Sequence, residues 1–140
     1  GNHVYGCDDC LSVCPWNKFA EAGSANRAFL SRPELAAPDI ADLLALDDAS
    51  FRAVFSGSPI KRSGRRRMVR NAAIAAGNSG DARFVAQLVS LLDDEEPQVR
   101  GAAIWALGRL DSERFEAERD RYLAAERDNS VRGEWLSSPT

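Results

Sequence analysis

The chain has 140 residues, of which 44% are hydrophobic and 28% are charged, and its formal net charge is −3. This composition is typical of an ordinary soluble globular protein, and no apolar run approaches the length of a transmembrane helix. The slightly acidic balance argues against a protein that coats nucleic acid over its whole surface, although it conceals one local basic cluster.

The three cysteines of the chain lie within eight residues, in the pattern Cys7-x2-Cys10-x3-Cys14-Pro15. The pattern matches the latter part of the bacterial ferredoxin run, in which the cysteine before the proline ligates the other cluster of a two-cluster protein. We therefore expect Cys7 and Cys10 to bind one iron–sulfur cluster and Cys14 the other. Three ligands complete neither cluster, so the remaining ligands are expected upstream of Gly1, in a larger protein of which this chain is a C-terminal fragment.

Two other uses of these thiols stay open at this point. A zinc site needs a fourth ligand, and the single histidine, His3, would make a cramped site with Cys7, Cys10 and Cys14. A disulfide is disfavoured because the cysteines are odd in number and no secretion signal is recognisable. Free thiols at metal-binding spacing indicate instead a reducing, cytoplasmic compartment.

After the cysteines, residues 15–22 predict a short helix that closes the loop. Trp16 is a candidate to cover the cluster, but core packing is the commoner role of such an aromatic residue. Residues 23–38 contain glycine, serine and proline without periodicity and indicate a connector. Two short helices are expected next, one from an Asp39 cap to residue 46 and one from an Asp48 cap to residue 55.

Six basic residues then fall within ten positions that hold no acidic residue: Lys61, Arg62, Arg65, Arg66, Arg67 and Arg70. If a helix begins near Arg62, then Arg62, Arg66 and Arg70 lie on one face at i, i+4 and i+8. Like charges at this spacing destabilise an isolated helix, which favours an anionic partner such as RNA. The alternative is a solvated basic face that pairs with the acidic side chains at 93–96.

A repeat begins inside this predicted helix. Val69-Arg70-Asn71-Ala72-Ala73-Ile74 aligns with Val99-Arg100-Gly101-Ala102-Ala103-Ile104, thirty residues on, and Val131-Arg132-Gly133 follows thirty-two residues later. The small residues at the repeated alanine positions predict close contact between these helices. Paired helices at this period are typical of a short HEAT-like solenoid.

The stretches Gly77 to Asp81 and Gly108 to Asp111 are expected to close the repeated helices, and the partner helices that follow are expected to be capped by Asp81 and Asp111. The predicted fold is mostly α. It comprises the C-terminal part of a ferredoxin-like iron–sulfur segment at 1–22, a connector with two short helices at 23–58, and a HEAT-like α-helical repeat domain at 59–140.

Several motifs occur together in a way that is more specific than the cysteine spacing alone. They are Tyr5-Gly6-Cys7-Asp8-Asp9-Cys10, Val13-Cys14-Pro15-Trp16-Asn17-Lys18, Ser58-Pro59-Ile60-Lys61-Arg62-Ser63-Gly64-Arg65, Arg70-Asn71 and Ala75-Ala76-Gly77-Asn78-Ser79-Gly80. Through these motifs, and over nearly its whole length, the chain resembles the C-terminal portion of epoxyqueuosine reductase.

The resemblance implies a cytoplasmic oxidoreductase that reduces epoxyqueuosine to queuosine in the anticodon loop of tRNA. It implies two [4Fe-4S] clusters, with Cys7, Cys10 and Cys14 among their ligands, and a cobalamin bound by an N-terminal domain that this chain lacks. The implied partners are the tRNA and an electron donor protein, with no membrane and no second subunit. No catalytic residue is expected on this chain, which alone should be inactive.

Two other functions remain open from the residues themselves. The chain could be an iron–sulfur electron-transfer protein whose HEAT-like module docks a protein, since such repeats most often bind proteins. It could also be a structural helical domain with a vestigial cysteine loop, because fold alone does not determine function.

Overall fold

The structure is a computed structural model that describes residues 3–6, 8–16 and 38–137. The chain divides into two compact units, one formed by Gly1–Tyr5 with Ile40–Thr140 and the other by Gly6–Asp39. The predicted connector and most of the predicted helix at 15–22 lie outside the described residues.

The described part of the small unit contains Cys10 and Cys14. Helix α1 (Asp9–Ser12) is one short turn, entered through Asp8 in the left-handed backbone region at φ 50°. The Ser12 amide donates to the Asp8 carbonyl at 2.9 Å, which closes the turn. Within residues 8–16 the backbone is helix and turn, with no strand among them. The ferredoxin-like character of this segment therefore stays a prediction.

The large unit begins with two short helices, as predicted, α4 (Ile40–Leu44) and α5 (Asp48–Val54). The cap of α5 is Asp47 and not Asp48, because the Asp47 carboxylate accepts from the Ser50 amide at 2.7 Å. Phe51 and Phe55 are each 2% exposed, and their rings lie 5.0 Å apart. The α5 turn therefore contributes an aromatic pair to the core.

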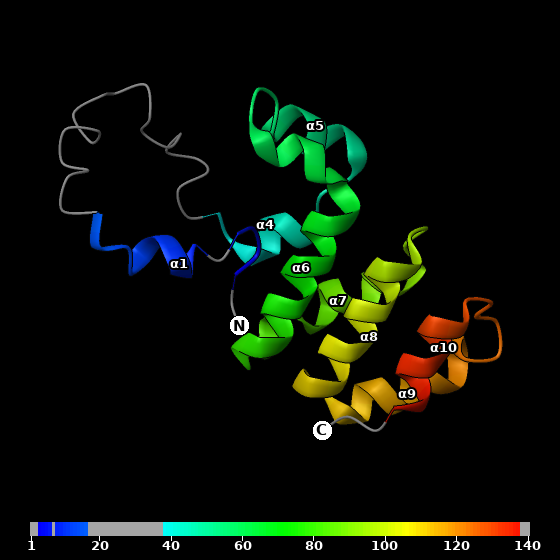
Figure 1. Ribbon diagram of the computed structural model, residues 1–140. Helices are drawn as coiled ribbons and strands as arrows, with labels where there is room; N and C mark the ends of the chain where they lie inside the picture. Colours follow the sequence, from blue (N-terminus) through cyan, green and yellow to red (C-terminus); the bar gives the residue numbers. More distant parts are fainter. Residues whose placement is uncertain (1–2, 7, 17–37, 138–140) are drawn as a thin grey trace. The chain divides into compact units, whose positions relative to one another are not determined.

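Three helices carry the repeat: α6 (Gly64–Ser79), α8 (Pro97–Leu110) and α10 (Asn129–Leu136). The repeated valines, Val69, Val99 and Val131, are at most 1% exposed. Equivalent positions of the sequence repeat are thus equivalent positions of the core, and the predicted all-helical solenoid is confirmed in this unit. Figure 1 shows α6, α8 and α10 following one another across it.

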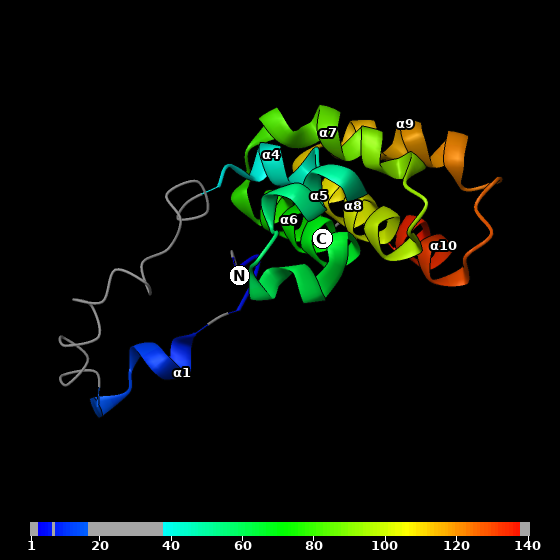
Figure 2. The same cartoon turned by 90° about the horizontal axis from the view of Figure 1, so that it is seen from above.

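The partner helices form a second layer. They are the 3₁₀ turn η4 (Ala82–Phe84) with α7 (Val85–Ser90) and η5 (Leu91–Asp93), and then α9 (Ser112–Tyr122). Figure 2 shows α7 and α9 on one side, with α6, α8 and α10 on the other. Asp81 and Asp111 cap these segments as predicted, since their carboxylates accept from the Arg83 and Arg114 amides, both at 2.9 Å.

Among the described helices, α6 and α8 share the most extensive contact. Gly77 lies inside α6 at this contact, and a Cβ built on it would meet the Ala106 Cα at 2.8 Å. The stretches 77–81 and 108–111 close their helices as predicted, since α6 ends at Ser79 and α8 at Leu110. Gly77 and Gly108 are buried inside these helices, and the residue in the left-handed region, at φ 71°, is the C-cap Gly80. Glycine at 77 serves backbone approach, because only a residue without a side chain fits there.

Aromatic side chains pack together in the core of the last repeat. Trp135 of α10 is 1% exposed and lies 5.3 Å from the ring of Phe115 and 6.3 Å from that of Tyr122. Asp128 caps α10 by accepting from the amides of Ser130 and Val131. No helix in the described ranges is both long enough and apolar enough to cross a bilayer.

Candidate nucleic-acid interface and cysteine loop

Two of the three predicted cluster ligands lie on described residues. Cys10 is an exposed free thiol on α1, and Cys14 is a half-buried free thiol just after that helix. Free thiols on a short turn are donors that an iron–sulfur cluster uses, so the residues present suit the group. Cys7 lies outside the described residues, and among the described residues no three metal-binding side chains gather.

Trp16 does not have the commoner role predicted for it, which is packing in the core. Its side chain is 72% exposed, so it is not part of the hydrophobic core. A role beside a cluster stays a prediction.

The predicted basic stripe is interrupted by the backbone. Lys61 and Arg62 lie on the 3₁₀ helix η3 (Pro59–Ser63), and Gly64, at φ 78°, separates this turn from the body of α6. The predicted stack of Arg62, Arg66 and Arg70 on one continuous helix is therefore wrong for Arg62. The cause is the change of helix type, since 3₁₀ and α turns place successive residues at different angles.

Arg65 is used within the fold. Its Nη2 and Nη1 donate to the two carboxylate oxygens of Asp94 at 2.5 and 3.3 Å, and its Nε donates to the Leu46 carbonyl at 2.6 Å. The Arg65 and Asp94 side chains are only 14% and 6% exposed. The hydrogen bond to Asp94 raises the pKa of Arg65 above its ordinary value. This arginine therefore ties the segment after α4 and the end of η5 to the first turn of α6.

Three arginines remain for a ligand on α6. Arg66 and Arg67 are exposed, and Arg66 makes a loose ion pair with Glu96 at 3.9 Å. Arg70 is half-buried, and its Nε and Nη2 donate to the Asn71 Oδ1 at 3.1 and 2.8 Å. The pairing with residues 93–96 that the sequence left as an alternative is thus firm for Arg65 and weak for Arg66.

Comparison of the repeats distinguishes Arg70 from its counterparts. Arg100 donates to the Glu126 carboxylate at 2.8 and 2.9 Å and to the Asp94 carbonyl at 2.8 Å. Arg132 donates to the carbonyls of Leu123 and Glu126 at 2.9 and 3.1 Å. These two arginines brace interhelical loops. Arg70 instead lines a surface groove, which is described next.

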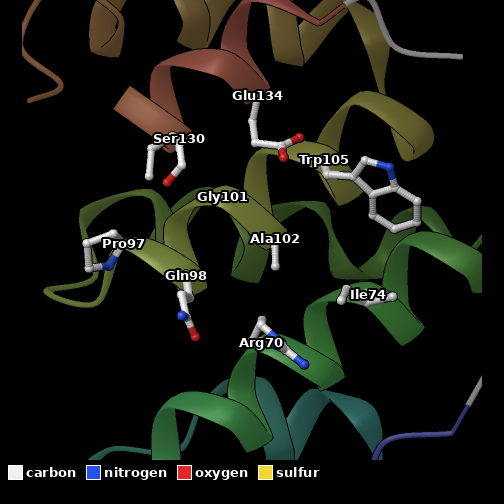
Figure 3. A pocket seen from close by; sticks show the side chains of 10 residues that line it. Arg70, Ile74, Pro97, Gln98, Gly101, Ala102, Trp105, Ser130 and Glu134 are labelled. Atoms are coloured by element: carbon white, nitrogen blue, oxygen red, sulfur yellow. The ribbon is translucent and has the colours of Figure 1, made fainter. Parts of the chain in front are cut away.

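The groove lies along the layer of α6, α8 and α10 and has a volume of about 510 Å³. Arg70 and Ile74 come from α6, while Ser130, Val131 and Glu134 come from the last repeat; the remaining lining residues are Pro97, Gln98, Gly101, Ala102 and Trp105 of α8. Figure 3 shows Arg70 and Glu134 entering from opposite walls, with Gly101 and Ala102 between them.

Sequence reasoning missed this groove. It assigned the small residues to helix contact, and this holds for Ala72, Ala73 and Ala103, which are not exposed at all. Ala102, in contrast, is half-buried and lines the groove. The available signal was Gly101 followed by Ala102, because two small neighbours on one helix can leave space as well as close it.

These features define a helical-repeat protein with a basic helix beside a groove. The HEAT repeats family matches residues 61–134, more than half of the chain, and the chain belongs to that family. It is homologous, more particularly, to the C-terminal region of epoxyqueuosine reductase.

Two relatives illustrate the homology. Epoxyqueuosine reductase of Xanthomonas campestris is 41% identical over 110 residues, covering 78% of this chain and 31% of that protein. The Bacillus subtilis enzyme is 32% identical over 133 residues, covering 94% and 34%. The chain spans about a third of the length of these curated relatives.

A solved relative extends the likeness to the fold. The crystal structure of an epoxyqueuosine reductase with an epoxyqueuosine-modified tRNA-Tyr stem loop matches with a TM-score of 0.86 at 31% identity. The match covers 97% of this chain and 36% of that one.

Proposed function

We propose that this chain acts as the C-terminal region of an epoxyqueuosine reductase, the cytoplasmic oxidoreductase that reduces epoxyqueuosine in the tRNA anticodon loop to queuosine. In this proposal its HEAT repeats hold the tRNA, and its cysteines ligate two [4Fe-4S] clusters together with ligands from other sequence. Cobalamin and the catalytic residues belong to the rest of such an enzyme. The single observation that carries the proposal is the homology over 97% of the chain to a tRNA-bound relative.

The arrangement of positive charge supports RNA as the partner. Arg66 and Arg67 are exposed, and Arg70 lies three residues further along the same helix at the groove. Arginines at such spacing suit successive phosphates of an RNA backbone, which they position without reading the bases. Glu134 on the opposite wall disfavours phosphate there, so we place the backbone along η3 and α6, with Lys61 and Arg62 at its end. Arg65 contributes through the fold.

The test is a double charge reversal, Arg66→Glu with Arg70→Glu, measured by binding of a tRNA anticodon stem loop at several salt concentrations. We expect weaker binding and a slope of log K against log salt that is smaller by about 1.5, because two phosphate contacts are lost. The same reversal at Arg83 and Arg121, which lie on the α7 and α9 layer, changes the net charge equally. Equal effects of the two pairs, or none from the first, would contradict the assignment.

The cysteines are tested separately from the RNA. In the proposed arrangement Cys7 and Cys10 ligate one cluster and Cys14 the other, and bound clusters would supply electrons one at a time. After anaerobic reconstitution of a protein that also carries the remaining ligands, we expect Cys10→Ser and Cys14→Ser each to lower iron and acid-labile sulfide. The two variants should alter different electron paramagnetic resonance signals. Unchanged iron in both would exclude the ligand role.

The groove favours a second candidate. It is lined by apolar and small residues as well as by one arginine, Arg70, and one carboxylate, Glu134, which suits a peptide. The chain would then be an iron–sulfur electron-transfer protein whose repeats dock a protein partner. Stem-loop binding that is absent, or that does not weaken with salt, would favour this function over the first.

A further inference from the structure

Asn71 joins two parts of the large unit that are far apart in the sequence. Its Nδ2 donates to the Val4 carbonyl at 2.7 Å, across 67 residues of chain. Val4 stands three residues before Cys7, so this bond holds the segment that leads into the cysteine loop. The other end of the same amide accepts from Nε and Nη2 of Arg70.

The orientation of the Asn71 amide follows from its neighbours. Arginine has only donors and a backbone carbonyl has only an acceptor, so Oδ1 must face Arg70 and Nδ2 must face Val4. A flipped amide would oppose donor to donor and acceptor to acceptor. One side chain therefore satisfies both partners in a single orientation, which links the position of one partner to that of the other.

Comparison of the repeats shows that this residue is particular to the first one. The position after the repeated arginine is Asn71 in the first repeat but Gly101 and Gly133 in the next two. Arg100 and Arg132 brace loops, whereas Arg70 is held by Asn71 at the groove. The bonds to Asn71 leave Nη1 and the second Nη2 hydrogen of Arg70 for a phosphate, which two such donors can bind together.

We propose that Asn71 is a positioning residue that couples RNA contact at Arg70 to the placement of the segment entering the cysteine loop. The part of this inference that concerns RNA rests on the proposed function. The anchoring of Val4 by Asn71 does not depend on RNA and is measured without it.

The first measurement is ¹⁵N relaxation of the backbone amides of residues 3–6 in the full chain. In the parent protein we expect order parameters near those of rigid backbone, about 0.85, and in Asn71→Ala values below about 0.6. Asn71→Asp should release the segment as well, since a carboxylate accepts from Arg70 but cannot donate to Val4. Asn129→Ala, at the start of α10, is the control and should leave these amides ordered.

The second measurement is titration with a tRNA anticodon stem loop. In the parent protein we expect the Tyr5 and Gly6 amide signals to shift as RNA binds, and in Asn71→Ala we expect these shifts to disappear while those near Arg66 persist. Affinity should fall about fivefold in Asn71→Ala, as for loss of one hydrogen bond, and further in Asn71→Asp because its charge neutralises Arg70.

The outcomes separate this inference from the proposed function. Equal order at residues 3–6 in the parent and Asn71→Ala would overturn the anchor. RNA binding that leaves Tyr5 and Gly6 unmoved would overturn the coupling while the proposed function stands. Absence of RNA binding in the parent protein would overturn the function and the coupling, and the relaxation data would still decide the anchor.

Discussion

Gly77 of α6 and Ala106 of α8 lie at the closest approach of the two central helices, where a Cβ on Gly77 would stand 2.8 Å from the Ala106 Cα and 2.9 Å from Trp105 Cζ3. Backbone atoms of α8 cannot move aside without shifting the whole helix. We expect Gly77→Ala to destabilise the protein by about 1–3 kcal/mol through overpacking. Thermal unfolding would show this as a Tm lower by about 3–10 °C.

Gly133 provides the matched control. It lies inside α10, and a Cβ there would meet no atom within 4 Å. Gly133→Ala should be neutral or stabilise by up to about 1 kcal/mol, because alanine is the better helix former. Similar Tm losses in the two variants would show that the tight contact at Gly77 does not exist.

The ion pair of Arg65 and Asp94 is expected to be structural. Both side chains are largely buried, and removal of one partner leaves the other charge without compensation. Arg65→Ala should cost about 2–3 kcal/mol in urea unfolding. Its neighbour Arg66 pairs loosely at the surface, so Arg66→Ala should change stability by less than about 0.5 kcal/mol. The reverse ranking would mean that Arg65 faces solvent.

Acid should weaken the brace between Arg100 and Glu126. The hydrogen bond from Arg100 holds the pKa of Glu126 below its ordinary value of 4.5. Since the unfolded chain takes up this proton at a higher pH than the folded one, the stabilisation is complete above a pH of about 4.5 and is lost as the pH falls through the lower folded-state pKa.

The measurement is urea unfolding of the parent and of Glu126→Gln between about pH 7 and pH 3. The variant should be less stable by about 1–2 kcal/mol at neutral pH. The gap should narrow as the pH drops below about 4.5, because the parent then loses the same charge. A gap that stays constant over this range would exclude a contribution from Glu126 ionisation.

The N-cap of α5 is Asp47 in the structure, one residue before the Asp48 cap predicted from the sequence. Asp47 accepts from the Ser50 amide, whereas Asp48 is the first residue of the helix. Asp47→Ala should therefore lower the stability more than Asp48→Ala, because only the first removes the cap and the second changes only the charge near the helix dipole. Chemical unfolding of both variants under the same conditions decides between them, and a larger loss at Asp48 would restore the cap predicted from the sequence.

The helical repeat was predictable because its motif recurs at a regular spacing in the sequence. Val69, Val99 and Val131 recur with their arginine neighbours, and each is buried in the core. The helix caps at Asp81 and Asp111 were equally predictable, since an N-cap needs only a suitable side chain and the backbone amides two or three residues further on. The third copy of the motif, Val131-Arg132-Gly133, lies on α10 (Asn129–Leu136).

The basic cluster could not be sorted in the same way. Six positive charges look alike in sequence, yet Arg65 is bound to a carboxylate 29 residues away, while Arg70 is bound to its neighbour Asn71. Likewise, the role of Gly77 depends on Ala106, which is distant in the chain. The distinction arises only when α6 packs against α4 and α8.

The helical repeat, its buried face, its caps and the thiol spacing follow from the order of the residues, because each depends on residues within one or two turns of one another. Which arginines brace the fold and which remain for a ligand, where the groove lies, and the bond from Asn71 to Val4 all depend on how the helices pack. These are properties of side chains from distant segments that meet after folding. The local sequence pattern does not predict these contacts, because the free energy that selects each partner comes from packing between helices.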